Sequence, residues 1–174
     1  MNDKIKVLID ENLIQKRVNE LALEISKDYK DEEIVLVCIL KGSSYFTVDL
    51  SKKLSNNDVV IDFMKVSSYG GNIETSGKIE FNLDLSTNIH GKNVIIVEDI
   101  IDSGLSLNYL YSYLKEKDPK SLKICVLLDK NGRRQKDIHV DYTGFEIENK
   151  FVVGYGLDFD EKYRNLPYIG YIET

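Results

Sequence analysis

The chain has 174 residues and a net charge of −6, from 23 basic and 29 acidic side chains. This length predicts one domain over residues 1–174 with room for a real core. The acidic balance argues against a nucleic-acid partner or a polybasic membrane contact, so a small anionic ligand would need local cations.

The N-terminal residues and the cysteines point to the cytoplasm. Residues 1–6 lack the apolar core of a signal peptide, and no run approaches the ~20 apolar residues of a membrane span. We therefore expect a cytoplasmic protein that binds no membrane. Cys38 and Cys125 each lie in an apolar strand-like run, where a thiol usually belongs to the core. A disulfide or a metal role is the less favoured alternative, because two lone cysteines show no ligand spacing.

The first half of the chain alternates helical and extended patterns. Residues 10–29 predict a helix, because apolar side chains form one stripe after Asp10, a residue type that caps helices. A strand over 34–40 follows, and then a short helix with Phe46, Leu50 and Leu54 on one face. Residues 59–66 predict a further strand.

Residues 67–92 form a polar, glycine-containing connection with one plausible strand, at 78–85. A long connection inside a compact domain is usually a lid or a disordered loop, so we expect a mobile active-site loop within 67–77. A passive surface hairpin is the alternative.

The second half of the chain continues the alternation. We expect strands at 94–97, 122–128, 138–142 and 151–153, and a helix through Leu107 and Leu114 that ends at Asp118–Pro119. Alternation of this kind predicts an α/β fold, with a mainly parallel twisted sheet flanked by helices on both faces.

Residues 94–107 carry the clearest chemical signal. An apolar strand runs into Glu98 and Asp99, and the polar loop Asp102-Ser103-Gly104-Leu105-Ser106 follows. In open α/β sheets ligands bind at the carboxyl ends of the strands. Two hydroxyls, a glycine that permits a sharp turn and the amides of a helix N-terminus suit a phosphate monoester. An ordinary buried strand with a solvated acidic turn is the alternative.

This segment resembles the phosphoribosyl-pyrophosphate motif of the type I phosphoribosyltransferases. Three further segments resemble the 6-oxopurine branch, the hypoxanthine-guanine phosphoribosyltransferases. Leu40-Lys41-Gly42-Ser43 is similar to its pyrophosphate loop, and Ser67-Ser68-Tyr69-Gly70 to the start of its mobile loop. Lys130, residues 151–158 and Arg164 are similar to its purine pocket and closing segment.

The resemblance implies a fold and an activity. The fold would be that of the type I family, with a small hood formed by the N- and C-terminal segments. The enzyme would transfer the 5-phosphoribosyl group from phosphoribosyl pyrophosphate to N9 of hypoxanthine or guanine, giving IMP or GMP and pyrophosphate in purine salvage. It would use Mg²⁺ and assemble as a homodimer or homotetramer.

Two other functions use the same phosphate motif. A regulatory protein could sense phosphoribosyl pyrophosphate and bind nucleic acid, but the acidic charge, the lack of an added helix-turn-helix domain and the presence of Asp102 weigh against it. The synthetases that make phosphoribosyl pyrophosphate resemble a duplicated, much longer chain.

The resemblance also implies roles at the phosphate and sugar end. Asp102 would be the general base or proton holder at the purine, and an Asp there could cap the following helix as well. The 5′-phosphate would bind the amides and hydroxyls of Ser103, Gly104, Leu105 and Ser106, with Leu105 contributing only its backbone. Glu98 and Asp99 would take the ribose hydroxyls and, directly or through water, Mg²⁺ together with Asp158. Ile100 would also line the substrate.

The remaining roles concern pyrophosphate and the base. Lys41, flanked by Leu40 and Gly42, would bind pyrophosphate; the Leu40–Lys41 peptide can be cis in this family, which the sequence does not reveal. Arg164 would be a second pyrophosphate contact. Lys130 would donate to the 6-oxo group. The other implied contacts are the Ser68–Tyr69 pair of the mobile loop, Phe151 stacked on the purine, and the main chain of Val152 and Asp158 on its Watson–Crick edge. His90 and His139 match no functional position.

Overall fold

The computed structural model describes residues 5–55, 58–68, 79–130, 132, 135–136 and 138–172. Tyr69 and most of the expected loop at 67–77 lie outside these residues. The elements in chain order are β1 (Ile5–Ile9), α1 (Glu11–Tyr29), β2 (Ile34–Ile39), α2 (Ser44–Lys53), β3 (Val59–Ser68), β4 (Ile79–Leu83), β5 (Asn93–Ile101), α4 (Leu105–Lys115), β6 (Ser121–Lys130), β7 (Tyr142–Ile147), β8 (Val152–Val153) and β9 (Ile169–Ile172).

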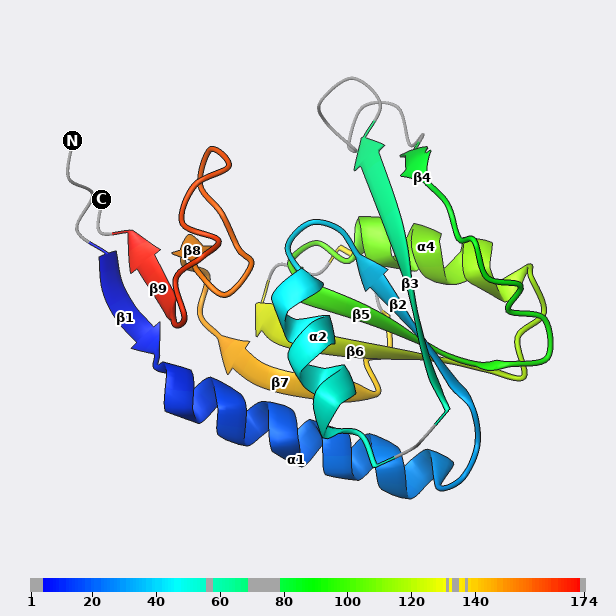
Figure 1. The fold of residues 1–174 in the computed structure, drawn as a ribbon. Helices are drawn as coiled ribbons and strands as arrows, with labels where there is room; N and C mark the ends of the chain where they lie inside the picture. The colour runs from blue at the N-terminus through cyan, green and yellow to red at the C-terminus, as the bar shows by residue number, and fades with distance from the viewer. Residues whose placement is uncertain are drawn as a thin grey trace.

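A six-stranded sheet in the order β4-β3-β2-β5-β6-β7 forms the centre of the molecule (Figure 1). Neighbouring strands are parallel except for β4, which runs antiparallel to β3. Every residue of β2 is buried, as expected for an apolar strand covered on both faces. The predicted α/β fold with a mainly parallel sheet is confirmed.

Helices cover the two faces of this sheet through separate apolar clusters. On one face, α1 and α2 pack on alternate residues of β2 and β5, such as Leu36 and Ile95. On the other face, α4 packs on the intervening residues, such as Val35 and Ile96. Period-two alternation of the strands therefore separates the two clusters. No helix within the described residues combines the length and the hydropathy needed to cross a membrane.

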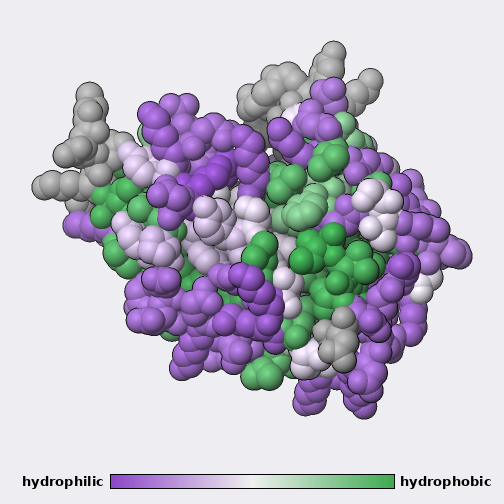
Figure 2. Space-filling view, in the orientation of Figure 1, coloured by the Kyte–Doolittle hydropathy of each residue, from purple (hydrophilic) through white to green (hydrophobic). Residues whose placement is uncertain are grey.

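Strand β3 is less completely covered than β2. Its side chains Ile61 and Phe63 remain 36% and 38% exposed. Figure 2 shows apolar surface on this face of the molecule, over β3 beside α2. This surface is the main apolar area visible in that view.

The first helix begins where the sequence predicts it. The carboxylate of Asp10 accepts a hydrogen bond from the backbone N–H of Leu13 at 2.9 Å and so caps α1. The predicted apolar stripe, from Ile14 to Tyr29, is buried against the sheet. Periodicity and capping together were sufficient to place this element.

The two ends of the chain form a second, three-stranded sheet in the order β1-β9-β8. Strand β1 pairs antiparallel with β9, which pairs antiparallel with β8. Figure 1 shows this small sheet at one end of the molecule, apart from the main sheet. The expected hood of N- and C-terminal segments is present.

The strand predicted at 138–142 is wrong. Strand β7 spans Tyr142–Ile147 instead, while residues 138–140 approach the core as an irregular segment. Ile138 is buried in the cluster beneath α4, so its apolar character reflects loop packing rather than a strand. The carboxylate of Asp141 accepts from the Ile124 amide at 2.8 Å and fixes the entry to β7.

The strand order creates a topological switch point between β2 and β5. From β2 the chain passes to β3 on one side, and it later returns to β5 on the other side. Because the loops after β2 and β5 then diverge, they leave a crevice at the carboxyl ends of these strands. The candidate site lies there.

Candidate functional site

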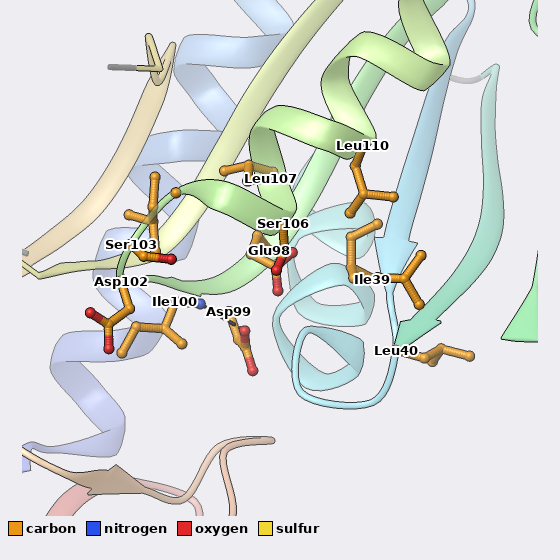
Figure 3. Close-up of a pocket in the computed structure, with 13 residues that line it drawn as sticks. Ile39, Leu40, Glu98, Asp99, Ile100, Asp102, Ser103, Ser106, Leu107 and Leu110 are labelled. Atoms are coloured by element: carbon orange, nitrogen blue, oxygen red, sulfur yellow. Dashed lines mark hydrogen bonds between the residues drawn. The ribbon is translucent and has the colours of Figure 1, made fainter. Parts of the chain in front are cut away.

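A cavity of about 330 Å³ occupies the crevice at the switch point. Figure 3 shows its close-up, with Ile39 and Leu40 at the end of β2 on one side and residues 98–107 on the other. Its apolar wall includes Leu107 and Leu110 of α4. The cavity is lined by Ile39, Leu40, Val66, Glu98, Asp99, Ile100, Ile101, Asp102, Ser103, Gly104, Ser106, Leu107 and Leu110.

The loop between β5 and α4 is built to present backbone amides. Gly104, the N-cap residue of α4, adopts a left-handed conformation with φ of 77° and has no side chain to cap the helix. The Ser103 carbonyl accepts from the Gln135 amide at 3.0 Å, which anchors the loop from the other side. The first amides of a helix that begins at glycine are a ready site for an anion.

Asp102 does not occupy the N-cap position of α4, which Gly104 holds. It lies opposite Lys130 instead, with its Oδ2 atom 3.5 Å from the Lys130 Nζ atom. The Lys130 side chain is 10% exposed and that of Asp102 42% exposed. A largely buried ammonium therefore faces a carboxylate that solvent and ligand can reach.

Glu98 and Asp99 form a close acidic pair at the base of the cavity. Burial raises the pKa of Glu98 well above its usual value, and the neighbouring Asp99 charge adds to the shift. Burial also raises the pKa of Asp99, while a hydrogen bond with Glu98 and the Arg164 cation oppose that rise. Burying two neighbouring carboxylates favours retention of a proton on Glu98.

The acidic pair can contribute to a metal site but does not form one alone. Among the described residues, no three His, Cys, Asp or Glu side chains are grouped closely enough to coordinate a metal ion. Asp158 is engaged elsewhere, 2.8 Å from the Arg164 guanidinium. Mg²⁺ commonly binds one or two protein carboxylates and completes its shell with substrate phosphates and water. The oxygen donors of Glu98 and Asp99 fit that pattern.

Three loops meet beside this acidic pair. A Cβ atom at Gly42 would lie 1.6 Å from the Asp99 Oδ2 atom, so only glycine allows the loop after β2 to approach that carboxylate. A Cβ atom at Gly156 would lie 2.0 Å from the Gly42 carbonyl oxygen, and Gly156 has φ of 99°. The Leu40–Lys41 peptide in the first of these loops is cis. Residues from β2, β5 and the segment after β8 thus converge.

The cations of the site lie in this same region. The Lys41 ammonium is 2.8 Å from the Glu161 carboxylate, and hydrogen bonding from Lys41 lowers the pKa of Glu161. The Arg164 guanidinium donates to the Gly156 carbonyl at 2.7 Å and contacts Asp158. Its Nε atom is buried and has no hydrogen-bond partner within the described part of the chain. An anion at this place would have two cations within reach.

The residues expected at the base lie outside the lining of the cavity. Phe151 is 54% exposed and packs edge-on against Phe159, with 5.5 Å between ring centroids. Val152, which belongs to β8, is buried. An exposed aromatic ring at the start of the hood is suited to stacking on a planar ligand. Lys130 lies beside the cavity through its contact with Asp102, which belongs to the lining.

Several contacts at the site could not be expected from the sequence. No local motif indicated that Glu161 would contact Lys41, or that Gly156 would touch Gly42. The sequence placed Val66 in a strand and Leu107 and Leu110 in a helix, and did not predict that these three side chains form an apolar wall of the cavity. The two glycines at 154 and 156, which flank Tyr155 and both have positive φ, were the one signal that could have suggested a tight approach.

The two cysteines lie in the core and the two histidines lie at the surface. Cys38 and Cys125 are buried and unpaired with each other, in agreement with a core role. The His90 and His139 side chains are 69% and 87% exposed. Neither imidazole lies in the lining of the cavity.

Comparison with known proteins gives matches along nearly the whole chain. The family model described as "Phosphoribosyl transferase domain" matches residues 6–160. The hypoxanthine-guanine phosphoribosyltransferase of Bacillus subtilis is 46% identical over 172 residues, which are 99% of this chain and 95% of that protein. The bifunctional protein TilS/HprT of Listeria monocytogenes is 44% identical over 172 residues, but this chain spans only 26% of its length.

Solved structures agree with the sequence matches. A crystal structure of a hypoxanthine-guanine phosphoribosyltransferase from Bacillus anthracis has a TM-score of 0.94 and 51% identity. The match covers 98% of this chain and 100% of that one.

Proposed function

Because this chain belongs to the phosphoribosyltransferase family, in its hypoxanthine-guanine branch, we propose that the crevice between β2 and β5 is its active site. The protein is an enzyme of purine salvage. It transfers the 5-phosphoribosyl group from phosphoribosyl pyrophosphate to N9 of hypoxanthine or guanine. The products are the nucleoside monophosphate and pyrophosphate.

The 5′-phosphate binds at the start of α4. The first amides of the helix, the Gly104 turn and the hydroxyls of Ser103 and Ser106 surround one part of the cavity. Leu105 contributes through its amide, which is 3.4 Å from the Ser103 Oγ atom. Helix-terminal amides favour a doubly charged phosphate without a cationic side chain.

The sugar and Mg²⁺ contact the acidic pair. Glu98 and Asp99 accept hydrogen bonds from the ribose hydroxyls, and Ile100 borders the same space. The residues that would hold Mg²⁺ are these two acids, with Asp158 as a further candidate. Bound Mg²⁺ would neutralise charge on the pyrophosphate group.

Pyrophosphate binds where the loops after β2 and β8 meet. Lys41 and Arg164 supply the cations, and the Gly42 backbone supplies an amide close to Asp99. As N9 of the purine bonds to C1 of the ribose, the C1–O bond breaks and its electron pair leaves with pyrophosphate. Positive groups placed at the departing oxygens stabilise this step.

Asp102 and Lys130, at the ends of β5 and β6, interact with the purine proton and the 6-oxo group. Asp102 accepts a proton from the purine ring as N9 reacts, which is the work of a general base. The Lys130 ammonium, 3.5 Å away, orients that carboxylate and donates to the 6-oxo group. Phe151 stacks on the ring, and the main chain of Val152 and Asp158 contacts its Watson–Crick edge.

The single observation that carries this assignment is the Asp102–Lys130 pair beside the N-terminus of α4, where Gly104 is the N-cap residue. A proton acceptor, a donor for an oxo group and a phosphate-binding turn thus occupy one place. The test is to incubate the protein with phosphoribosyl pyrophosphate, Mg²⁺ and each purine in turn, and to measure nucleotide and pyrophosphate. Hypoxanthine and guanine should react in equimolar yield of both products, and absence of both products would refute the assignment.

The proposal also covers the oligomeric state of the protein and its location in the cell. A homodimer or homotetramer is supported by the partly exposed Ile61 and Phe63 on β3, because an apolar patch of this kind often marks a protein interface. A cytoplasmic location and a loop at 67–77 that covers the substrate through Ser68 and Tyr69 remain predictions.

A further inference from the structure

One carboxylate lies between the two cations assigned to pyrophosphate. The Glu161 Oε2 atom is 2.8 Å from the Lys41 Nζ atom and 3.5 Å from the Arg164 Nη2 atom. These cations come from opposite ends of the chain, and Lys41 and Glu161 are 120 residues apart in sequence. A single side chain therefore bridges two positive groups that come from separate loops.

The turn that carries Glu161 presents this carboxylate in a defined position. Its amide donates to the Asp158 Oδ2 atom at 2.8 Å. Phe159 and Lys162 form two backbone hydrogen bonds, at 3.1 and 3.0 Å, around the turn. The Glu161 side chain is itself 65% exposed, so it can leave the cations without opening the core.

We propose that Glu161 is an internal counter-anion that occupies the pyrophosphate position of the ligand-free enzyme and is displaced when a pyrophosphate group binds. The inference rests on the proposed function, because it takes Lys41 and Arg164 as the pyrophosphate cations. In the free enzyme Glu161 keeps these cations together and compensates their charge. In the complex the phosphate oxygens take both cations.

Competition between the Glu161 carboxylate and the ligand lowers the affinity for phosphoribosyl pyrophosphate in the forward reaction and for pyrophosphate in the reverse reaction. Phosphoribosyl pyrophosphate has to displace the carboxylate in order to bind, and the carboxylate favours departure of pyrophosphate after the transfer. Exposed ion pairs are weak, so removing the competitor should tighten pyrophosphate binding by only about two- to tenfold. An effect of this size indicates a residue that adjusts the turnover rate and is not required for turnover.

The variant Glu161→Gln tests the proposal, because it keeps the shape of the side chain and removes its charge. Asp160→Asn is the matched control: it makes the same charge change one residue away, and the Asp160 carboxylate contacts only Lys162, at 3.9 Å, among the ion pairs of the described residues. Titration calorimetry with pyrophosphate and Mg²⁺ measures the dissociation constant for both variants and the native protein. Steady-state assays give KM for phosphoribosyl pyrophosphate and kcat.

The expected result is a lower Kd for pyrophosphate and a lower KM for phosphoribosyl pyrophosphate in Glu161→Gln, with both constants near native in Asp160→Asn. Weaker or unchanged binding in Glu161→Gln would overturn the proposal, since a purely structural or ligand-binding role predicts loss and not gain. An equal gain in both variants would also overturn it, because a general charge effect would then suffice. If the native protein bound neither pyrophosphate nor phosphoribosyl pyrophosphate, the proposed function itself would fail.

Discussion

Asp102 and Lys130 face each other at the carboxyl ends of neighbouring parallel strands, with 3.5 Å between the carboxylate Oδ2 and the ammonium Nζ. Asp102 directly follows β5, and Lys130 is the last residue of β6. Since the register pairs Ile101 with Asp129, the sheet itself brings the two side chains together. The proposed proton acceptor and the proposed donor for the 6-oxo group are thus positioned by strand pairing, which is more rigid than a loop.

Lys130 should decide which purines react. An ammonium has only donors, so it matches the 6-oxo group of hypoxanthine or guanine and opposes the 6-amino group of adenine. A site built on such a bond can reject the mismatched analogue by up to about 10⁴–10⁵-fold. Lys130→Gln should narrow the ratio of kcat/KM between hypoxanthine and adenine, mainly through loss of hypoxanthine turnover. Lys120→Gln, at an exposed position paired with Glu32, is the control. An unchanged ratio in Lys130→Gln would contradict the assignment.

Glu98 should destabilise the ligand-free protein as pH rises. Burial raises its pKa in the folded state, so between the usual carboxyl pKa of 4.5 and the raised value the folded protein binds more protons than the unfolded chain. The free energy of unfolding then falls with rising pH across that window, and the loss persists above it. Below the usual pKa both states are protonated and no loss exists.

Glu98→Gln should therefore melt at a higher temperature than the native protein at mildly alkaline pH, with the gain disappearing at acidic pH. Each kcal/mol corresponds to about 2–4 °C for a chain of this size. Activity should fall at the same time, because the proposal has this carboxylate contact the ribose. Scanning calorimetry across pH measures the effect, with the 82% exposed Glu148 changed to Gln as the control. If the melting temperatures of Glu98→Gln and the native protein differed by the same amount at all pH values, titration of Glu98 would be ruled out as the cause.

Gly156 should be intolerant of any side chain. A Cβ atom there would lie 2.0 Å from the Gly42 carbonyl, so Gly156→Ala must push apart the two loops to which we assign pyrophosphate binding. A displacement of about 1 Å at a reacting group can cost on the order of 10²-fold in rate. Gly91→Ala separates this effect from backbone strain, because Gly91 also has positive φ, 69°, and meets no atom within 4 Å. Comparable activity in the two variants would show that the contact does not matter.

The sequence was most informative where one segment carries both strand and ligand chemistry. Residues 94–107 form one continuous unit from β5 to α4, so their order alone predicted the turn between strand and helix and the location of Glu98 and Asp99 near it. The apolar run at 94–97 likewise predicted a strand covered on both faces, and these four residues of β5 are buried. Local sequence patterns were sufficient here because the residues that form these elements are adjacent in the chain.

Long-range contacts were not predictable in this way. The Lys41–Glu161 ion pair depends on the hood meeting the main sheet, and no spacing along the chain reveals it. The strands β1 and β9 are short and find their partners at opposite ends of the sequence. At 138–142, apolar alternation predicted a strand, but packing of Ile138 beneath α4 satisfied the same pattern in a loop. The roles of the individual site residues remain proposals.

The catalytic role of Asp102 is tested most directly by the single-turnover rate of nucleotide formation in Asp102→Asn, with hypoxanthine, phosphoribosyl pyrophosphate and Mg²⁺. The amide keeps the size of the side chain but cannot accept the purine proton, so the rate should fall by about 10²–10⁴-fold. Melting temperature and pyrophosphate affinity should stay near native, as they should in the exposed control Asp31→Asn. A native rate in Asp102→Asn, or a loss of rate matched by a loss of folding, would contradict the account.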